Sequence, residues 1–295
     1  FLMLAMIFMM LPRAQVSANR INEVLDTEIT VKDGTIDNNT NNEVGTVEFK
    51  NVGFKYPDGE DYVLKDISFK ANKGETVAFI GSTGSGKSTL INLVPRFYDA
   101  TEGEILVDGV NVKDYKLTSL YNKIGYVAQK AVIFNDTVSG NVSYGDNGKG
   151  EISREKVKEA IEVAQGKDFV EKMENSYDTQ MAQGGSNVSG GQKQRISIAR
   201  AIARNPEIYI FDDSFSALDY KTDSILRKEL KKYTKDATTL IVAQRIGTIM
   251  NADKILVLDD GNLVGMGTHK ELLESCEVYK QIALSQLSKE ELDNA

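Results

Sequence analysis

The segment that most restricts the fold of this chain is Gly81–Ser88, which reads Gly-Ser-Thr-Gly-Ser-Gly-Lys-Ser. It matches the pattern G-x-x-x-x-G-K-[ST] at every fixed position. The apolar run Val77–Ile80 precedes it as a short strand, and a helix is expected to begin at about Lys87. A strand, a glycine-rich turn and a helix in this order form a loop whose backbone N–H groups surround phosphate oxygens. A chance glycine-rich turn is the alternative, and the flanking strand and helix argue against it.

Two side chains of this loop have expected roles on a bound nucleotide. We expect the Lys87 ammonium to reach the β- and γ-phosphates and the Ser88 hydroxyl to bind Mg²⁺. A carboxylate, Asp212, ends the apolar run Ile208–Phe211 and can hold Mg²⁺ directly or through water. The candidate phosphate-binding residues are Gly81, Ser82, Thr83, Gly84, Ser85, Gly86, Lys87, Ser88 and Thr89.

Strand-like and helix-like segments alternate along the rest of the chain. Such alternation favours an α/β fold with a parallel sheet covered on both faces, and the phosphate loop makes it a P-loop ATPase core with a helical insertion. Ser153 is a plausible N-cap, and Asp259–Asn262 reads as a turn leading into Leu263. Strands are predicted at Val47–Tyr56, Val63–Phe69, Thr239–Val242 and Ile255–Leu258, and helices at Arg13–Leu25, Ser153–Met173 and Lys221–Tyr233.

The N-terminus is an unbroken apolar run, Phe1–Leu11, followed by Pro12. A spanning helix needs about 20 apolar residues, so this run alone is too short to cross a bilayer. It also lacks the basic leader of a signal peptide. It is either the end of a truncated transmembrane helix or a buried helix end, and a chain that starts with Phe favours truncation. Arg13 and Arg20 would then lie on the cytoplasmic flank.

Composition excludes several classes of protein. Hydrophobic residues make up 41% of the 295 residues, which is typical of a globular chain. The formal net charge of −8 disfavours a nucleic-acid partner. Cys276 is the one cysteine, so no disulfide can form within the chain, and His269 is the one histidine, which argues against a histidine-built metal site.

A second motif narrows the family. Val188-Ser-Gly-Gly-Gln192 is followed by Lys-Gln-Arg-Ile-Ser-Ile-Ala-Arg-Ala201. This stretch resembles the signature LSGGQ of ATP-binding-cassette (ABC) proteins and the helix behind it, with Val for Leu at the first position. It lies between the phosphate loop and Asp212, in the order of that family. The resemblance implies that Ser189, Gly190, Gly191 and Gln192 contact the γ-phosphate of a nucleotide held by the opposite subunit.

The resemblance implies further site residues, position by position. Tyr56 in Phe-Lys-Tyr-Pro matches the aromatic residue that stacks on adenine, although an ordinary strand aromatic is the alternative. Gln129 in Gly-Tyr-Val-Ala-Gln matches the glutamine that senses Mg²⁺ and the attacking water, so the metal ligands would be Ser88, Gln129 and Asp212. Asp219 in Ser216-Ala-Leu-Asp matches the loop that crosses the dimer interface.

The layout is similar to that of exporters, in which the membrane and ATPase domains share one chain. Ala131–Asn141 would face the membrane domain, as would Gln183–Asn187, which lacks the Glu-Arg usual in that loop. The implied fold is a RecA-like core with an N-terminal antiparallel β-subdomain and an inserted α-helical subdomain. The expected divisions are residues 1–25 for the helix end, 26–45 for a linker, 46–287 for the cassette with its helical subdomain at about 131–195, and 288–295 for a tail.

Two positions depart from the family pattern at the reaction centre. The residue after Asp212 is normally a glutamate that acts as general base, and here it is Asp213. The switch histidine of Ala-His-Arg is replaced by Gln244, which can donate a hydrogen bond but cannot become cationic. Together they resemble the degenerate half of a heterodimeric exporter, which binds Mg-ATP but hydrolyses it poorly. The alternative is a homodimer in which Asp213 still serves as the base.

The sequence disfavours three other functions of P-loop proteins. Non-transport ABC ATPases carry coiled-coil or nucleic-acid-binding insertions, which this sequence lacks. A purely regulatory nucleotide-binding module would not need the signature, and a P-loop kinase would not carry its helix. The expected partners are therefore a transmembrane domain of the same full-length chain and a second, non-identical subunit, with the ATPase domain on the cytoplasmic face of the cell membrane. The exported substrate, whether drug, lipid or peptide, would be chosen by membrane helices outside this sequence.

Overall fold

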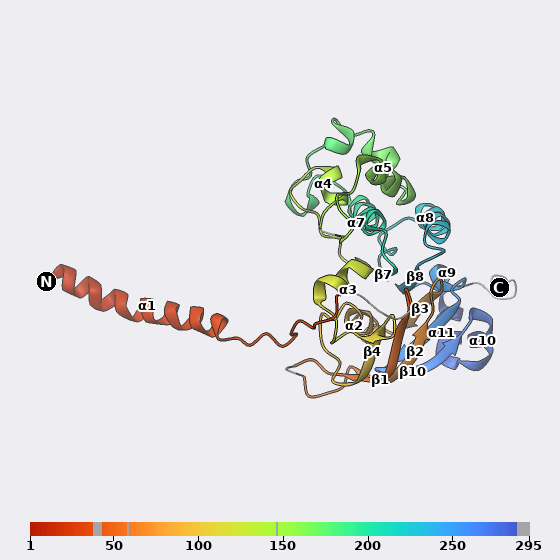
Figure 1. The fold of residues 1–295 in the computed structure, drawn as a ribbon, viewed down its shortest axis with the longest axis horizontal. Coiled ribbons are helices and arrows are strands. Elements are labelled where there is room, and N and C mark those ends of the chain that lie inside the picture. Colours follow the sequence, from red (N-terminus) through yellow and green to blue (C-terminus); the bar gives the residue numbers. More distant parts are fainter. Residues whose placement is uncertain (38–42, 58, 146, 288–295) are drawn as a thin grey trace. The chain divides into compact units, whose positions relative to one another are not determined.

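The computed structural model describes residues 1–37, 43–57, 59–145 and 147–287 (Figure 1). These residues form two compact units, which are divided between Lys32 and Asp33. Residues 38–42 of the expected linker and the expected tail, 288–295, lie outside the described residues. Backbone N–H groups of Gly34 and Ile36 donate to the carbonyls of Tyr115 and Asp114, so the second unit begins within the expected linker.

The first unit consists mainly of one helix, α1 (Leu2–Leu25), which continues through Pro12. It joins the apolar run Phe1–Leu11 to the predicted helix Arg13–Leu25, and none of its residues is buried. By length and composition α1 could cross a membrane, with a mean hydropathy of 1.2. The run that is too short by itself is therefore part of a helix of sufficient length.

A six-stranded sheet forms the centre of the second unit, in the order β10-β9-β3-β8-β7-β6. Pairs β9–β3, β3–β8, β8–β7 and β7–β6 are parallel, and β10 pairs antiparallel with β9. The predicted strands are confirmed with ends shifted by one or two residues, whereas β6 and β10 were not predicted as strands. The strands are β3 (Thr76–Gly81), β6 (Ile124–Val127), β7 (Ile208–Asp212), β8 (Thr238–Val242), β9 (Lys254–Asp259) and β10 (Asn262–Gly267).

Alternate residues of these strands enter two different hydrophobic clusters. Ala78 and Phe211 belong to a cluster with the helices on one face of the sheet. Val77 and Ile210 belong to a cluster with α2 (Lys87–Leu93) and a second sheet on the other face. The period of two along each strand places successive side chains on opposite faces, so both faces are buried, as predicted.

The second sheet is antiparallel, in the order β2-β1-β4-β5, and it corresponds to the expected N-terminal β-subdomain. Its strands are β1 (Val47–Phe54), β2 (Leu64–Ala71), β4 (Glu102–Val107) and β5 (Val110–Asn111).

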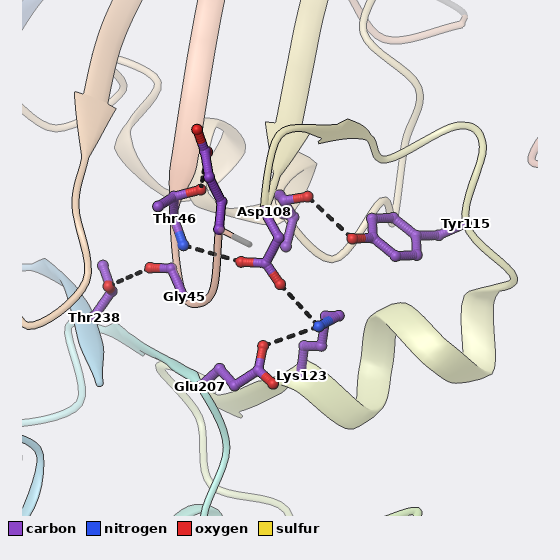
Figure 2. A network of polar contacts seen from close by, with 9 residues as sticks. Gly45, Thr46, Asp108, Tyr115, Lys123, Glu207 and Thr238 are labelled. Carbon is purple, nitrogen blue, oxygen red and sulfur yellow. Dashed lines mark hydrogen bonds and ion pairs between the residues drawn. The ribbon is translucent and has the colours of Figure 1, made fainter. Parts of the chain in front are cut away.

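A buried polar network joins the two sheets (Figure 2). Asp108, which is fully buried, accepts a hydrogen bond from the backbone N–H of Thr46 at 3.0 Å. The Lys123 ammonium, at the end of α3 (Leu117–Lys123), lies 2.8 Å from Asp108 and 2.9 Å from Glu207, directly before β7. Burial opposes the charge on Lys123, but its bonds to the two carboxylates outweigh this and raise the pKa of Lys123.

Helices α4 and α5 lie at the end of this unit away from the sheets (Figure 1). The single helix predicted at Ser153–Met173 is wrong, because the chain forms α5 (Arg154–Val163) and α6 (Lys167–Val170). Gln165 takes a φ of 57°, and the N–H of Gly166 donates to Ile161, which closes α5. The other helices are α4 (Val138–Val142), α7 (Gly190–Arg204), α8 (Tyr220–Tyr233), α9 (Ile246–Ile249), α10 (His269–Ser275) and α11 (Glu277–Gln286), with 3₁₀ turns at Ser176–Asp178 and Gln183–Gly185.

Candidate functional site

One group of the predicted site residues meets at the carboxyl edge of the parallel strands. The phosphate loop follows β3, Asp212 ends β7, Gln244 lies two residues after β8, and Gln129 lies two residues after β6. Because these strands are parallel and adjacent, their carboxyl ends share one edge of the sheet, where α/β proteins bind ligands. The structure thus brings together residues that are separated by up to 163 positions in the sequence (from 81 to 244).

The phosphate loop needs glycine at two positions for different reasons. A Cβ on Gly81 would lie 1.9 Å from the carbonyl oxygen of Leu258, so Gly81 is required by the packing of β3 against β9. Gly86 has a φ of 95° and forms the N-cap of α2, a conformation that disfavours other residues. The first glycine therefore serves the sheet, and the last shapes the start of the helix.

The Lys87 ammonium lies inside this loop. It donates to the carbonyl oxygens of Gly81 at 2.9 Å and Ser82 at 2.7 Å, and it lies 3.3 Å from the Ser85 hydroxyl. Burial lowers the pKa of Lys87, although the neighbouring carboxylates favour its charged form. A cation held at the centre of a loop is suited to binding phosphate oxygens.

Ser88 and Asp212 offer two oxygens at the foot of α2. The Ser88 hydroxyl donates to Asp212 Oδ1 at 2.8 Å, and burial raises the pKa of Asp212. Among the residues that the structure describes, no cluster of three or more His, Cys, Asp or Glu side chains could hold a metal. A few hard oxygen ligands fit Mg²⁺, which is usually bound by one or two protein ligands together with water and substrate phosphates.

Asp213 is the centre of the site. Its Oδ2 accepts hydrogen bonds from Gln244 Nε2 at 2.8 Å and from Gln129 Nε2 at 3.2 Å. It is 7% exposed and has a φ of 45°, which Asp tolerates better than most residues. Burial raises the pKa of Asp213, and the amide donors oppose the rise. Sequence reasoning placed these three residues at one site but did not predict that one oxygen joins both glutamines.

Tyr56 lies beside α2. Its hydroxyl is 3.0 Å from the Thr89 hydroxyl, and its ring meets Tyr98 edge to face at 5.1 Å. Tyr98, which is 37% exposed, was missed by sequence reasoning because it lies in no motif. Tyr56 and Tyr98 therefore form an aromatic pair, and the contact of Tyr56 with Thr89 places this pair beside the helix that follows the phosphate loop.

The signature segment has a structural role within this chain. Ser189 is the N-cap of α7: its hydroxyl accepts the N–H of Gln192, whose side chain accepts the N–H of Ser189. A Cβ on Gly191 would lie 3.2 Å from the carbonyl of Ala217, whereas a Cβ on Gly190 would meet nothing within 4 Å. Local packing therefore leaves the face at Gly190 open.

Asp219 has a similar local role as the N-cap of α8. It accepts the N–H of Thr222 at 3.0 Å, and this bond lowers the pKa of Asp219. In the described part of the chain, neither Asp219 nor Ser189–Gln192 forms a hydrogen bond or ion pair with the phosphate loop. By their hydrogen bonds, the predicted site residues therefore fall into two groups, one at the sheet edge and one at the N-caps of α7 and α8.

The segment Ala131–Asn141 is held against α7 by Arg200. The guanidinium donates to the carbonyls of Asn141 at 2.7 Å and Val132 at 3.0 Å, and it lies 5.0 Å from the centroid of the Phe134 ring. Burial lowers the pKa of Arg200 to about 10. This side chain links the segment directly to the helix behind the signature.

The family model described as ABC transporter matches residues 64–216, which include the phosphate loop, the signature and Asp212. This chain belongs to the ABC transporter family. The match excludes the P-loop kinase alternative. It also agrees with the α/β fold of the ABC ATPase domain, including the antiparallel β-subdomain.

Relatives in this family extend beyond the chain. It is 44% identical to an uncharacterized ABC transporter ATP-binding protein of Mycobacterium tuberculosis (strain ATCC 25618 / H37Rv), over 97% of this chain and 49% of that protein. It is also 44% identical to a putative multidrug export ATP-binding/permease protein of Staphylococcus aureus (strain NCTC 8325 / PS 47), over 88% of this chain and 44% of that protein. The chain spans about half the length of these curated relatives.

A solved structure gives the same result for the fold. A bacterial Atm1-family ABC exporter with ATP bound matches 97% of this chain and 50% of its own, with a TM-score of 0.85 and 35% sequence identity. Both units of the chain therefore have counterparts in an exporter that holds ATP.

Proposed function

We propose that this chain is the nucleotide-binding domain of an ABC exporter, which binds Mg-ATP and couples dimer closure and hydrolysis to export across a membrane. The observation that carries the proposal is the set of contacts at one edge of the sheet: Lys87 lies inside the phosphate loop, Ser88 bonds to Asp212, and Gln129 and Gln244 bond to Asp213. The exporter role is supported by the name of the Staphylococcus relative, the ATP-bound structural match and the length and composition of α1.

In the proposed binding mode, Lys87 and the loop N–H groups hold the β- and γ-phosphates, and Tyr56 stacks on adenine. The bond between the Tyr56 and Thr89 hydroxyls supports this mode, because it sets the ring beside the helix that follows the phosphate loop. Ser88, Asp212 and the Gln129 side-chain oxygen would hold Mg²⁺, which supplies positive charge to the phosphate oxygens when bound. Nucleotide in this position would replace the loop carbonyls as partner of Lys87.

We infer that the chain's own site hydrolyses ATP slowly. Asp213 is one methylene shorter than glutamate, so its carboxylate is withdrawn by about 1.5 Å. A displacement of about 1 Å can lower a rate on the order of 10²-fold. Two amide donors already occupy Oδ2, which leaves Oδ1 to accept a proton from water. Gln244 can donate to a γ-phosphate but carries no charge there.

The second half of the proposal concerns a partner subunit. Ser189–Gln192 would complete the site of a second, non-identical subunit, and Asp219 would lie at the interface between the two. This is supported by the open face at Gly190 and by the capping bonds of the signature, which join it to its own helix; among the described residues no hydrogen bond joins it to the chain's own phosphate loop. A homodimer is the second candidate, and it is favoured by one observation: burial raises the pKa of Asp213, which makes its carboxylate a stronger base.

The deciding experiment compares ATP turnover and Mg-ATP affinity of the wild type with those of the double variant Asp213→Glu/Gln244→His, at high protein concentration. Tight binding, negligible turnover of the wild type and a clear gain in the variant would support a degenerate site. Fast turnover of the wild type would favour the homodimer instead. Lys87→Ala serves as the control that removes nucleotide binding.

The proposed location is a cell membrane, with the ATPase unit on its cytoplasmic face and a transmembrane domain in the same full-length chain. Arg13 and Arg20 on α1 support this orientation because cytoplasmic flanks are rich in basic residues. Protease digestion of sealed, inverted vesicles that carry the full-length protein tests it. Protection of the ATPase unit in those vesicles would contradict the proposed orientation.

A further inference from the structure

Gln286, the last residue of α11, makes two hydrogen bonds to the loop that carries Gln244. Its Nε2 donates to the backbone carbonyl of Gln244 at 2.7 Å, and its Oε1 accepts the backbone N–H of Ile246 at 2.8 Å. One side-chain amide therefore holds two backbone groups of a three-residue segment that lies about 40 residues earlier in the chain.

The bond to Ile246 supplies a cap that the local sequence does not provide. Ile246 is the first residue of α9, and the first N–H groups of a helix have no partner within the helix. The N-cap residue is Arg245, whose side chain makes no capping bond. An arginine has no acceptor to offer, so the acceptor comes from Gln286 on another helix.

The bond to the Gln244 carbonyl holds the backbone of Gln244. The Gln244 side chain donates to Asp213 Oδ2, while the Gln286 amide holds its backbone. Gln244 is itself exposed, so packing alone does not fix its position. Two hydrogen bonds at opposite ends of the residue set the direction in which its side chain points.

Helix α11, which carries Gln286, is packed in the hydrophobic core. Tyr279 and Ala283 of α11 are fully buried, and the Tyr279 hydroxyl lies 2.7 Å from Nδ1 of the buried His269. Since α11 is fixed in the core at these positions, Gln286 can hold the more exposed loop of Gln244.

We propose that Gln286 is a positioning residue, which orients Gln244 toward the γ-phosphate of ATP bound at the chain's own phosphate loop. This inference rests on the proposed function, in which Gln244 contacts that phosphate. ADP lacks the γ-phosphate, so the preference for ATP over ADP is the property that Gln286 controls.

The test measures the dissociation constants of Mg-ATP and Mg-ADP for the full chain in detergent, by displacement of a fluorescent ADP analogue. Gln286→Ala removes two neutral hydrogen bonds, and we expect the preference for ATP to fall about three- to tenfold while the ADP affinity stays unchanged. Gln281→Ala is the matched control, since this exposed glutamine of the same helix pairs with Glu277 and leaves both affinities as in the wild type.

Gln286→Glu separates the two bonds. It keeps an acceptor for the N–H of Ile246 but loses the donor to the carbonyl of Gln244, so the preference for ATP should fall while the melting temperature stays near that of the wild type. An equal loss of ATP and ADP affinity in Gln286→Ala would mean a merely structural role and would overturn the inference.

The variant Gln244→Ala and the double variant Gln244→Ala/Gln286→Ala distinguish the role of Gln286 from the role of Gln244. If Gln286 acts through Gln244, the double variant has the same preference for ATP as Gln244→Ala alone. Additive losses would overturn the inference, as would a loss in Gln244→Ala that Gln286→Ala does not reproduce. An unchanged preference in Gln244→Ala would instead refute the role proposed for Gln244 itself, and the inference with it.

Discussion

Gln244 Nε2 lies 2.8 Å from Asp213 Oδ2, the oxygen that also accepts the amide of Gln129. The two positions that depart from the family pattern at the reaction centre are therefore bonded to each other. A shortened carboxylate and a neutral switch residue form one hydrogen-bonded unit, in which an amide donor replaces the imidazole of a histidine. This pairing explains how both changes fit one site without leaving a buried carboxylate unpaired.

The first prediction concerns the charge on Asp213. Asp213→Asn removes the proposed general base. It also places a side-chain amide against the amide donors of Gln129 and Gln244. We expect residual ATP turnover to fall by at least about tenfold, because general-base catalysis contributes roughly 10²–10⁴-fold in ordinary sites. ATP affinity should stay close to the wild-type value. Turnover and equilibrium binding on one sample check this, and unchanged turnover would show that Asp213 is not the base.

The second prediction concerns pH and the buried carboxylate of Asp212. Burial raises its folded-state pKa above the usual 3.8, so the charged form costs stability at neutral pH. Asp212→Asn keeps an acceptor for the Ser88 hydroxyl and should stabilise the nucleotide-free chain by about 1 kcal/mol at pH 7. The gain should shrink as the pH falls through the folded pKa and disappear below 3.8, where Asp212 is protonated in the folded and the unfolded state alike. Thermal unfolding across this range measures it, and a gain that persists at acid pH would contradict the sign.

The third prediction concerns the buried network that joins the two sheets. Lys123→Met removes the ammonium that lies 2.8 Å from the fully buried Asp108, which should cost about 3–5 kcal/mol of unfolding free energy. Because the folded pKa of Lys123 is raised, this contribution is constant at neutral pH and is lost only as the pH rises above 10.5. Denaturant unfolding measures the cost.

Two companion variants serve as its controls. Asp108→Asn/Lys123→Met, which removes both charges, should recover part of the stability. Glu207→Gln should cost less than Lys123→Met, because Glu207 is 34% exposed. A Lys123→Met variant as stable as the wild type would show that the network does not support the fold.

The fourth prediction uses the open face at Gly190. In the described ranges, no atom beyond the chain neighbours and the backbone of α7 lies within 4 Å of a Cβ added there, so Gly190→Ala should leave the melting temperature unchanged within about 1 °C. It should nevertheless weaken the ATP-dependent association with a second subunit, because the methyl group would occupy the space of the partner's phosphate. Size-exclusion chromatography in the presence of ATP, under conditions in which ATP is not hydrolysed, checks this. Normal association of Gly190→Ala would argue against the proposed interface.

The fifth prediction separates the two roles of Ser189. Ser189→Ala removes the cap of α7 and should cost about 1 kcal/mol of stability. Ser189→Asp keeps a capping oxygen, so it should be nearly as stable as the wild type, yet its charge should repel a γ-phosphate and prevent association. Thermal unfolding and chromatography of both variants check this, and an Asp variant that associates normally would limit Ser189 to capping.

Local features of the fold could be predicted because their causes lie within a few residues. The motif Gly81–Ser88 can be recognised from its own residues and two flanking elements, although Gly81 also lies against the carbonyl of Leu258 on β9, and Ser153 caps α5 as predicted. The break after Val163 was missed, although Gly166 was a visible signal, because Gln165 adopts the left-handed conformation usually taken by glycine. Strand β6 was missed because Gly125 interrupts its apolar residues, whereas a predicted strand of the same length, Ile208–Phe211, is an unbroken apolar run.

By itself, the sequence determined the phosphate loop, the signature motif and the identity of each residue at the reaction centre. Only the tertiary structure decided that Gln129 and Gln244 share one oxygen of Asp213, and that Gln286 holds the backbone of Gln244. The physical reason is that local patterns depend on contacts between neighbours in the chain, which the sequence displays directly. Contacts across a sheet depend on strand order and register, and these follow from the packing of the whole domain.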